Sequence, residues 1–289
     1  MKNIHVFAAA LPSFYMLETK LEEAEGLLFS PLTDSQWSKL GLNPKQQMIS
    51  LDNGYRIDFV YSSKDMPKPQ ITEEVQLLIE NLDYEPSKEE IGEMTESVVN
   101  EFCARVIPKT IKFSAYYHPT KETLIFDCKE DLSQRGLSLL LKVLGSIETK
   151  TLHCSGISNS LTTNMLNCLR DPDEHNITNF AGFGAGDLLV LQNKEKDVAR
   201  FKGDYPLDNV RELLEDGYEI KQINLSKDGV AFTLTENFKI KAIKTSFDVV
   251  EKDFGDQDQY DNYMQSLELQ LIVSHCEELR NFFDQSLEA

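Results

Sequence analysis

The chain has 289 residues, of which 41% are hydrophobic, and its formal net charge is −19. This length and composition allow a sizeable core in one large domain or in two to three smaller ones. The negative charge excludes attraction of nucleic acid to the whole surface, although a local basic groove remains compatible with it.

The apolar and cysteine patterns predict a cytoplasmic protein with no membrane partner. No apolar run reaches the roughly 18 residues needed to cross a bilayer, and the apolar start of the chain turns polar by Pro12, too early for a secretory signal. The five cysteines are scattered and form no CxxC pair, as is usual for reduced thiols. We therefore expect neither a disulfide framework nor a zinc site.

The N-terminal third predicts alternating strands and helices. Apolar side chains alternate over residues 4–8 and 55–61, as in half-buried strands. Helical spacing of apolar residues predicts helices over 14–28, 33–40, 72–82 and 87–104. Ser87 and Glu90 have the spacing of a capping box that would start the last of these helices.

The remaining chain contains more strands, often in direct succession. We expect strands over 112–118, 123–128, 149–154, 187–192, 198–202, 219–225, 230–235, 238–243 and 267–273. Helices are expected over 132–144, closed by Gly145, over 161–169 and 207–215, and from Ser274 to the end. The turn at 227–229 indicates a hairpin. Consecutive strands favour an α+β fold, with mixed antiparallel sheets and flanking helices.

The segment 102–121 is basic and contains no acidic residue. It carries Arg105, Lys109, Lys112 and Lys121, whereas residues 73–101 hold ten carboxylates and the single Lys88. Two interpretations remain open: these cations pair with their acidic neighbours, or they are available to an anionic partner. Composition alone favours the first interpretation.

Polar clusters elsewhere favour solvated loops over catalytic sites. Residues 171–175 combine carboxylates with His175 but lie around Pro172, and the glycines of 182–186 lack the GK[ST] ending of a phosphate loop. His153 and Cys154 would point to opposite faces of a strand. A nuclease would need carboxylates grouped around a metal ion, and no such group is recognisable. We expect no enzymatic activity, no metal and no cofactor.

Basic residues on separate predicted strands suggest one shared surface. Lys239 and Lys241 project to the same side of a strand, and Arg200 and Lys202 lie on another. Together with the segment 105–112 they could line one concave surface. Such a surface would contact phosphates without reading bases.

The order and spacing of motifs across nearly the whole chain resemble the bacterial recombination-associated RdgC family. Each motif is weak alone, and the resemblance comes from their succession. The motifs are Lys2-Asn3, Phe29-Ser-Pro31, Gln36, Gly41, Pro44, Met66-Pro67, residues 102–109, 124–128 and 140–146, and the strand and helix order of 207–243 and of the C-terminus.

The resemblance implies a DNA-binding protein without enzymatic activity. It implies elongated, curved subunits that form a ring-shaped homodimer, with double-stranded DNA in a positively lined hole. Bound to the nucleoid, such a protein antagonises RecA-promoted strand exchange. The corresponding regions would be a central α+β region (1–70 and 112–160), a helical tip (71–111) and a C-terminal α+β base (161–289).

The resemblance also assigns roles to individual residues. Arg105 and Lys109 stand at the basic positions of the family's "PRAFSR" segment, and Ile107 stands where the family has an aromatic residue at a tip-to-tip dimer contact. The expected phosphate contacts are Arg105, Lys109, Lys112, Lys202, Lys239 and Lys241. Ala104 replaces the family's proline, and acidic residues within 85–90 replace a Lys-rich segment, so the fold and dimer carry over better than the DNA affinity.

The acidic composition supports an alternative function. The chain would then be a protein-binding or DNA-mimicking member of the same fold, with weak or no DNA binding. Its acidic segments 73–101 and 248–261 would engage a basic partner. A positive concave surface favours DNA binding, and an unbroken negative surface favours this alternative.

Overall fold

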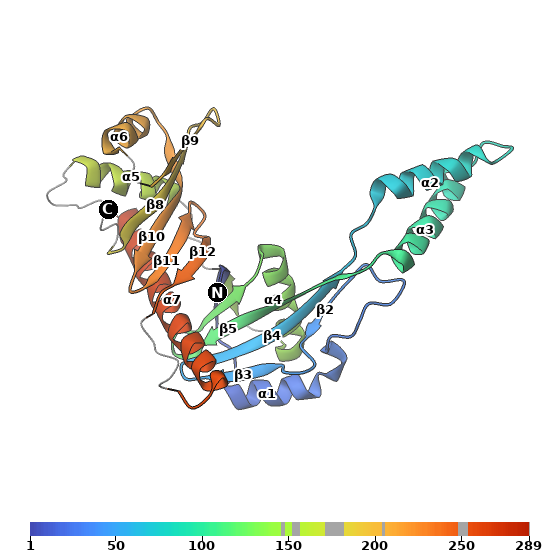
Figure 1. Ribbon diagram of the computed structural model, residues 1–289, viewed down its shortest axis with the longest axis horizontal. Helices are drawn as coiled ribbons and strands as arrows, with labels where there is room; N and C mark the ends of the chain where they lie inside the picture. The colour runs from blue at the N-terminus through green and yellow to red at the C-terminus, as the bar shows by residue number, and fades with distance from the viewer. Residues whose placement is uncertain (146–147, 152–156, 171–181, 204–205, 248–253, 289) are drawn as a thin grey trace.

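A computed structural model describes residues 1–145, 148–151, 157–170, 182–203, 206–247 and 254–288 (Figure 1). Residues 171–175 and the pair His153-Cys154, considered above as site candidates, lie outside these described residues. Within them the chain forms one large antiparallel sheet and seven α-helices. The predicted α+β fold is confirmed.

The strands and helices alternate along the chain. The strands are β1 (Asn3–Ala9), β2 (Ser38–Leu42), β3 (Met48–Leu51), β4 (Gly54–Ser63), β5 (Lys109–His118), β6 (Thr123–Asp127), β7 (Thr149–Thr151), β8 (Gly184–Gln192), β9 (Val198–Lys202), β10 (Glu219–Lys227), β11 (Val230–Thr235) and β12 (Ile240–Thr245). The helices are α1 (Phe14–Glu23), α2 (Lys68–Glu80), α3 (Lys88–Arg105), α4 (Glu130–Leu144), α5 (Ile157–Arg170), α6 (Leu207–Glu215) and α7 (Gln257–Glu288).

The first strand joins the two halves of the sheet. The strand order is β2-β4-β5-β6-β1-β12-β11-β10-β8-β9, with β3 added to β4 and β7 added to β1. On one side β1 pairs with β6, and on the other Asn3 pairs with Lys241 and Ile4 with Ile240. Strands from the beginning and the end of the chain therefore share one continuous sheet.

Two hydrophobic cores lie on opposite faces of this sheet. Ile4 and Val6 of β1 belong to a core that includes side chains of α5, α6 and α7, whereas Phe7 and Ala9 belong to a core with α1 and α4. Strands β8 and β10–β12 contribute to the first core only. Their opposite face is not covered by a helix in the part of the chain that the structure describes.

The molecule is curved, with a hollow between two arms (Figure 1). One arm contains β8–β12 with α5 and α6. The other is the long β4–β5 ribbon, which ends in the α2–α3 hairpin. The hairpin has its own small core of Ile71, Val75 and Val98.

Local signals position several element ends as predicted. At the start of α3, Ser87 Oγ accepts a hydrogen bond from Glu90 N (3.3 Å), and the Glu90 carboxylate accepts one from Ser87 N (2.8 Å). Gly145 ends α4 with φ +80°. The hairpin between β10 and β11 turns through Asp228 and Gly229, both at positive φ, as a type I′ turn requires.

Two predicted elements are wrong. The segment 33–40 was expected to be helical, but β2 begins at Ser38 and pairs with β4, so long-range pairing overrides a weak helical pattern. The strand expected over 267–273 is part of α7, so the terminal helix begins at Gln257 and not at Ser274. Its apolar residues also satisfy a helical period, and the buried residues of that helix follow it: Leu269, Ile272, Val273, Cys276 and Leu279.

Candidate nucleic-acid interface

An irregularity in β12 brings two lysines to one face of the sheet. Thr233 of β11 pairs with Lys241, and Ala231 pairs with Lys244. The two-residue separation on β11 therefore lies opposite a three-residue separation on β12. The extra residue forms a bulge at Ala242, whose φ is +52°. Residues three apart normally point to opposite faces of a strand. The bulge instead places Lys241 and Lys244 on the uncovered face.

The edge strand β9 adds two cations to the same face. Ala199 and Phe201 pack against the first core, so Arg200 and Lys202 project to the other side. The pairing confirms this assignment, because Arg200 lies opposite Val190, which pairs through Gln222 with Thr235 of β11. Thr235 and Thr233 share one face of β11.

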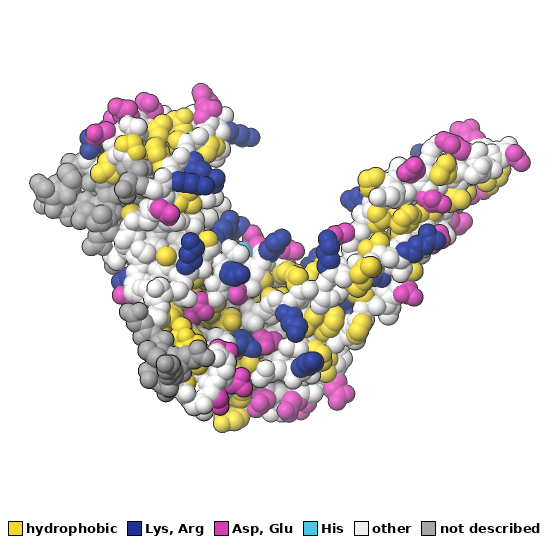
Figure 2. Space-filling view, in the orientation of Figure 1, with side chains coloured by type: hydrophobic (Ala, Val, Ile, Leu, Met, Phe, Trp, Pro, Cys, Tyr) yellow, Lys and Arg dark blue, Asp and Glu magenta, His cyan; other side chains and the backbone are white. Residues whose placement is uncertain are grey.

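We call Arg200, Lys202, Lys241 and Lys244 the open basic face. All four are exposed, and none forms an ion pair with another described residue. Figure 2 shows Lys and Arg side chains along the inner contour of the molecule, whereas Asp and Glu gather on the far ends of the arms and on the outer side. A focused positive surface therefore exists despite the net charge of −19.

The dimensions of this face suit a polyanion. Strands β12 and β9 are separated by β11, β10 and β8, which at the usual strand spacing makes about 19 Å. The major groove of B-DNA is about 12 Å wide. Cations on the two strands can therefore contact phosphates on both sides of that groove.

The basic segment 102–121 is largely paired with its acidic neighbours. Arg105 pairs with Glu101, Lys109 with Asp65, and Lys121 with Glu277 at 2.8 Å. The hydrogen bond to Asp65 raises the pKa of Lys109. Three of the four cations in this segment therefore pair with acidic neighbours, as the first of the two interpretations expects. All three pairs are solvent-exposed, where water and salt weaken the attraction between the partners, so a phosphate can replace the carboxylate.

The fourth cation, Lys112, lies on the other face of the sheet. Asn3 and His5 share the face of Lys241, and His5 pairs with Phe126, which pairs with Ala115. Lys112 is an odd number of residues from Ala115 and points to the opposite side. Lys112 therefore does not extend the open basic face.

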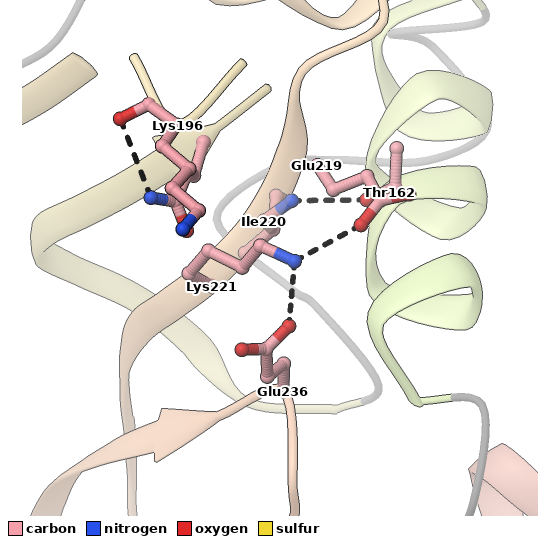
Figure 3. A network of polar contacts seen from close by, with 7 residues as sticks. Thr162, Lys196, Glu219, Ile220, Lys221 and Glu236 are labelled. Carbon is pink, nitrogen blue, oxygen red and sulfur yellow. Dashed lines mark hydrogen bonds and ion pairs between the residues drawn. The ribbon is translucent and has the colours of Figure 1, made fainter. Parts of the chain in front are cut away.

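Two further lysines are neutralised locally. Lys239 donates a hydrogen bond to Glu130 at the start of α4, at 2.5 Å. Lys221 lies between Glu219 (3.0 Å) and Glu236 (2.7 Å), as Figure 3 shows. Burial lowers the pKa of Lys221, but hydrogen bonds to the two carboxylates outweigh burial and hold the pKa above its usual value. Lys221 is therefore a structural cation.

Sequence reasoning located part of this surface. Lys202 and Lys241 lie on the open basic face, and Lys239 lies beside it. Lys244 was missed, because strict alternation assigns it to the face of Ile240. No local signal marks the bulge, since alanine rarely adopts a positive φ. Ile107 lies just beyond α3 and is 85% exposed.

The described residues contain neither a metal-ligand cluster nor a membrane-spanning helix. No three His, Cys, Asp or Glu side chains there are grouped as a metal site would require. None of the described helices combines the length and apolar character needed to cross a bilayer.

Comparison with known proteins places the chain in a family. No curated protein matches it closely. A family model described as "Putative exonuclease, RdgC" matches residues 1–289, the whole chain. This match agrees with the resemblance seen in the sequence motifs, and the chain belongs to the RdgC family, whose membership fits a role in recombination.

Proposed function

We propose that this protein binds double-stranded DNA without sequence preference and hinders RecA-type recombinases by covering the duplex. The observation that carries the proposal is the open basic face, where four cations without ion-pair partners among the described residues share one uncovered side of the sheet. In an acidic chain, cations without carboxylate partners on one face create a local positive potential that attracts an external polyanion.

The proposed binding mode uses phosphates and not base edges. Lys and Arg neutralise phosphates and release counterions, which makes affinity independent of sequence and dependent on salt. The acidic outer surface repels DNA. Together these two effects direct the duplex into the hollow, and the proposed activity requires no bond cleavage.

A homodimer would close this hollow into a ring. Ile107, at the base of the α2–α3 hairpin, exposes 85% of its surface, and burial of such a side chain against a second copy is favourable by about 1.5–3 kcal/mol. Analytical ultracentrifugation of Ile107→Ser tests this contact. A ring requires a lower dimer affinity for the variant than for the native chain, and equal affinities contradict it.

Fluorescence anisotropy with a short labelled duplex tests DNA binding. The native chain should bind at 50 mM salt and lose affinity steeply as salt rises. Arg200→Glu/Lys244→Glu should abolish binding. Arg105→Glu/Lys109→Glu removes cations that already have carboxylate partners and should weaken it less. Absence of binding by the native chain at low salt contradicts the proposal.

The same samples test the mechanism. Strand exchange by a RecA-type recombinase should slow when the native chain is added and proceed normally with Arg200→Glu/Lys244→Glu. The labelled duplex should remain intact on a denaturing gel after incubation with Mg²⁺. Progressive shortening from its ends would instead assign the exonuclease activity that the family description names.

The α2–α3 hairpin supports a second candidate function, binding of a basic protein. Carboxylates on this hairpin are exposed on several sides, and few cations lie among them: Glu73, Glu74, Glu80, Asp83, Glu85, Glu89, Glu93, Glu96 and Glu101. If the native chain inhibits strand exchange without binding DNA, and neutralising Glu89, Glu93 and Glu96 removes the inhibition, this function replaces the first.

A further inference from the structure

A pocket of about 320 Å³ lies where the two halves of the sheet meet. The strands β1 and β12 pair at only two positions, and β1 then continues along β7. The strands therefore diverge, and the beginning of α4 borders the resulting space. Its polar and ionisable lining includes Asn3, Cys128, Lys129, Glu130, Lys239 and Lys241.

The charges in this pocket are unbalanced. Three lysines face one carboxylate, Glu130, which accepts a hydrogen bond from Lys239 at 2.5 Å. Lys129 and Lys241 form no ion pair with the residues that the structure describes. Burial, together with Asp127 and Asp131, raises the pKa of the Cys128 thiol to about 12, so this side chain is neutral. Lys129 and Lys241 therefore line the pocket without a carboxylate in ion-pair contact, although Asp127 and Asp131 lie nearby.

The pocket is continuous with the open basic face. Lys241 belongs to both, and its partner in the sheet, Asn3, lines the pocket. A duplex lying on β9–β12 therefore passes the opening of the pocket. The anion that this position would receive is a backbone phosphate.

The geometry points to a phosphate subsite in which Glu130 acts as an internal competitor. This inference rests on the proposed DNA binding. Without DNA, the Glu130 carboxylate accepts the hydrogen bond from Lys239. When DNA binds, a phosphodiester competes with Glu130 for this hydrogen bond, because both oxyanions accept hydrogen bonds from an ammonium group. The phosphate engages Lys129, Lys239 and Lys241 fully only when the carboxylate is absent. Glu130 thus keeps the affinity below the value that the lysines alone would give.

The experiment compares the native chain with Glu130→Gln by duplex anisotropy across a salt series. Loss of the competing carboxylate should tighten binding about two- to fivefold, the range equivalent to an exposed ion pair. The slope of log K against log salt should become steeper by about 0.9, the value for one more phosphate contact.

Glu277→Gln is the matched control. It removes the same charge and also frees an ion-paired lysine, because Glu277 contacts Lys121 at 2.8 Å, away from the pocket. If both variants tighten binding equally, net charge explains the effect and the subsite is refuted. Unchanged or weaker binding by Glu130→Gln also refutes it.

A second variant identifies the phosphate contact itself. Lys129→Gln should reduce affinity more in the Glu130→Gln background than in the native chain, because the phosphate reaches Lys129 fully only without the competitor. Equal reductions refute this coupling. Lys202→Gln/Lys244→Gln tests the open basic face outside the pocket, so failure of the subsite and failure of the proposed function give different results.

Discussion

Neutralising two cations of the open basic face should change the salt dependence of DNA binding by a predictable amount. Lys202 and Lys244 lie on different strands of this face, and neither forms an ion pair with a described residue. Each phosphate contact contributes about 0.9 to the slope of log K against log salt. Lys202→Gln/Lys244→Gln should therefore lower this slope by about 1.8.

This difference is large enough to measure. Between 50 and 200 mM salt, four contacts predict a loss of affinity of about 150-fold, whereas two contacts predict about 12-fold. Anisotropy titrations at five salt concentrations in this range give the slope directly. Circular dichroism of each variant checks that the fold is retained.

The control changes the same number of charges elsewhere. Lys121 contacts Glu277, and Lys221 contacts both Glu219 and Glu236. These lysines are already neutralised, so Lys121→Gln/Lys221→Gln should leave the slope within about 0.5 of the native value. If both double variants lower the slope equally, binding depends on overall charge and the reasoning from the open basic face is wrong.

Three further predictions concern stability. Gly136→Ala in α4 should lower the free energy of unfolding by about 1 kcal/mol, because the new Cβ would lie 2.7 Å from the Phe126 ring and overpacking outweighs helix propensity; denaturant unfolding measures it, and a gain refutes the packing argument. Ala242→Gly should raise the free energy of unfolding by about 0.5 kcal/mol, and Ala242→Val should lower it by at least about 1 kcal/mol. The reason is that only glycine adopts the bulge's φ of +52° without strain. A higher melting temperature for the valine variant than for the glycine variant contradicts the bulge. Burial lowers the pKa of His275 below 6.5, although the Lys227 carbonyl, Glu278 and Asp228 oppose this shift. The unfolded chain therefore takes up the proton first, and the stability of the fold should decrease as pH drops through 6.5. Melting temperatures measured from pH 7.5 to 5.5 should fall less for His275→Gln than for the native chain, and an equal fall refutes the assignment.

The local elements and the fold class follow from the amino-acid sequence. The capping box at Ser87, the Gly145 helix end and the turn at Asp228-Gly229 all follow from side chains and backbone preferences within a few residues. Alternation of apolar residues located most strands, and their succession indicated α+β. The family also followed from motif order, and the full-length family match agrees with it.

Which cations share a surface depends on contacts between distant parts of the chain. Lys244 joins Lys241 because pairing with β11 accommodates an extra residue at Ala242, and Lys112 falls on the other face because of the register between β1, β6 and β5. The carboxylate partners of Lys109 and Lys239 also come from distant parts of the chain. Register, bulges and ion partners depend on long-range contacts, and a periodicity read within one segment cannot contain them.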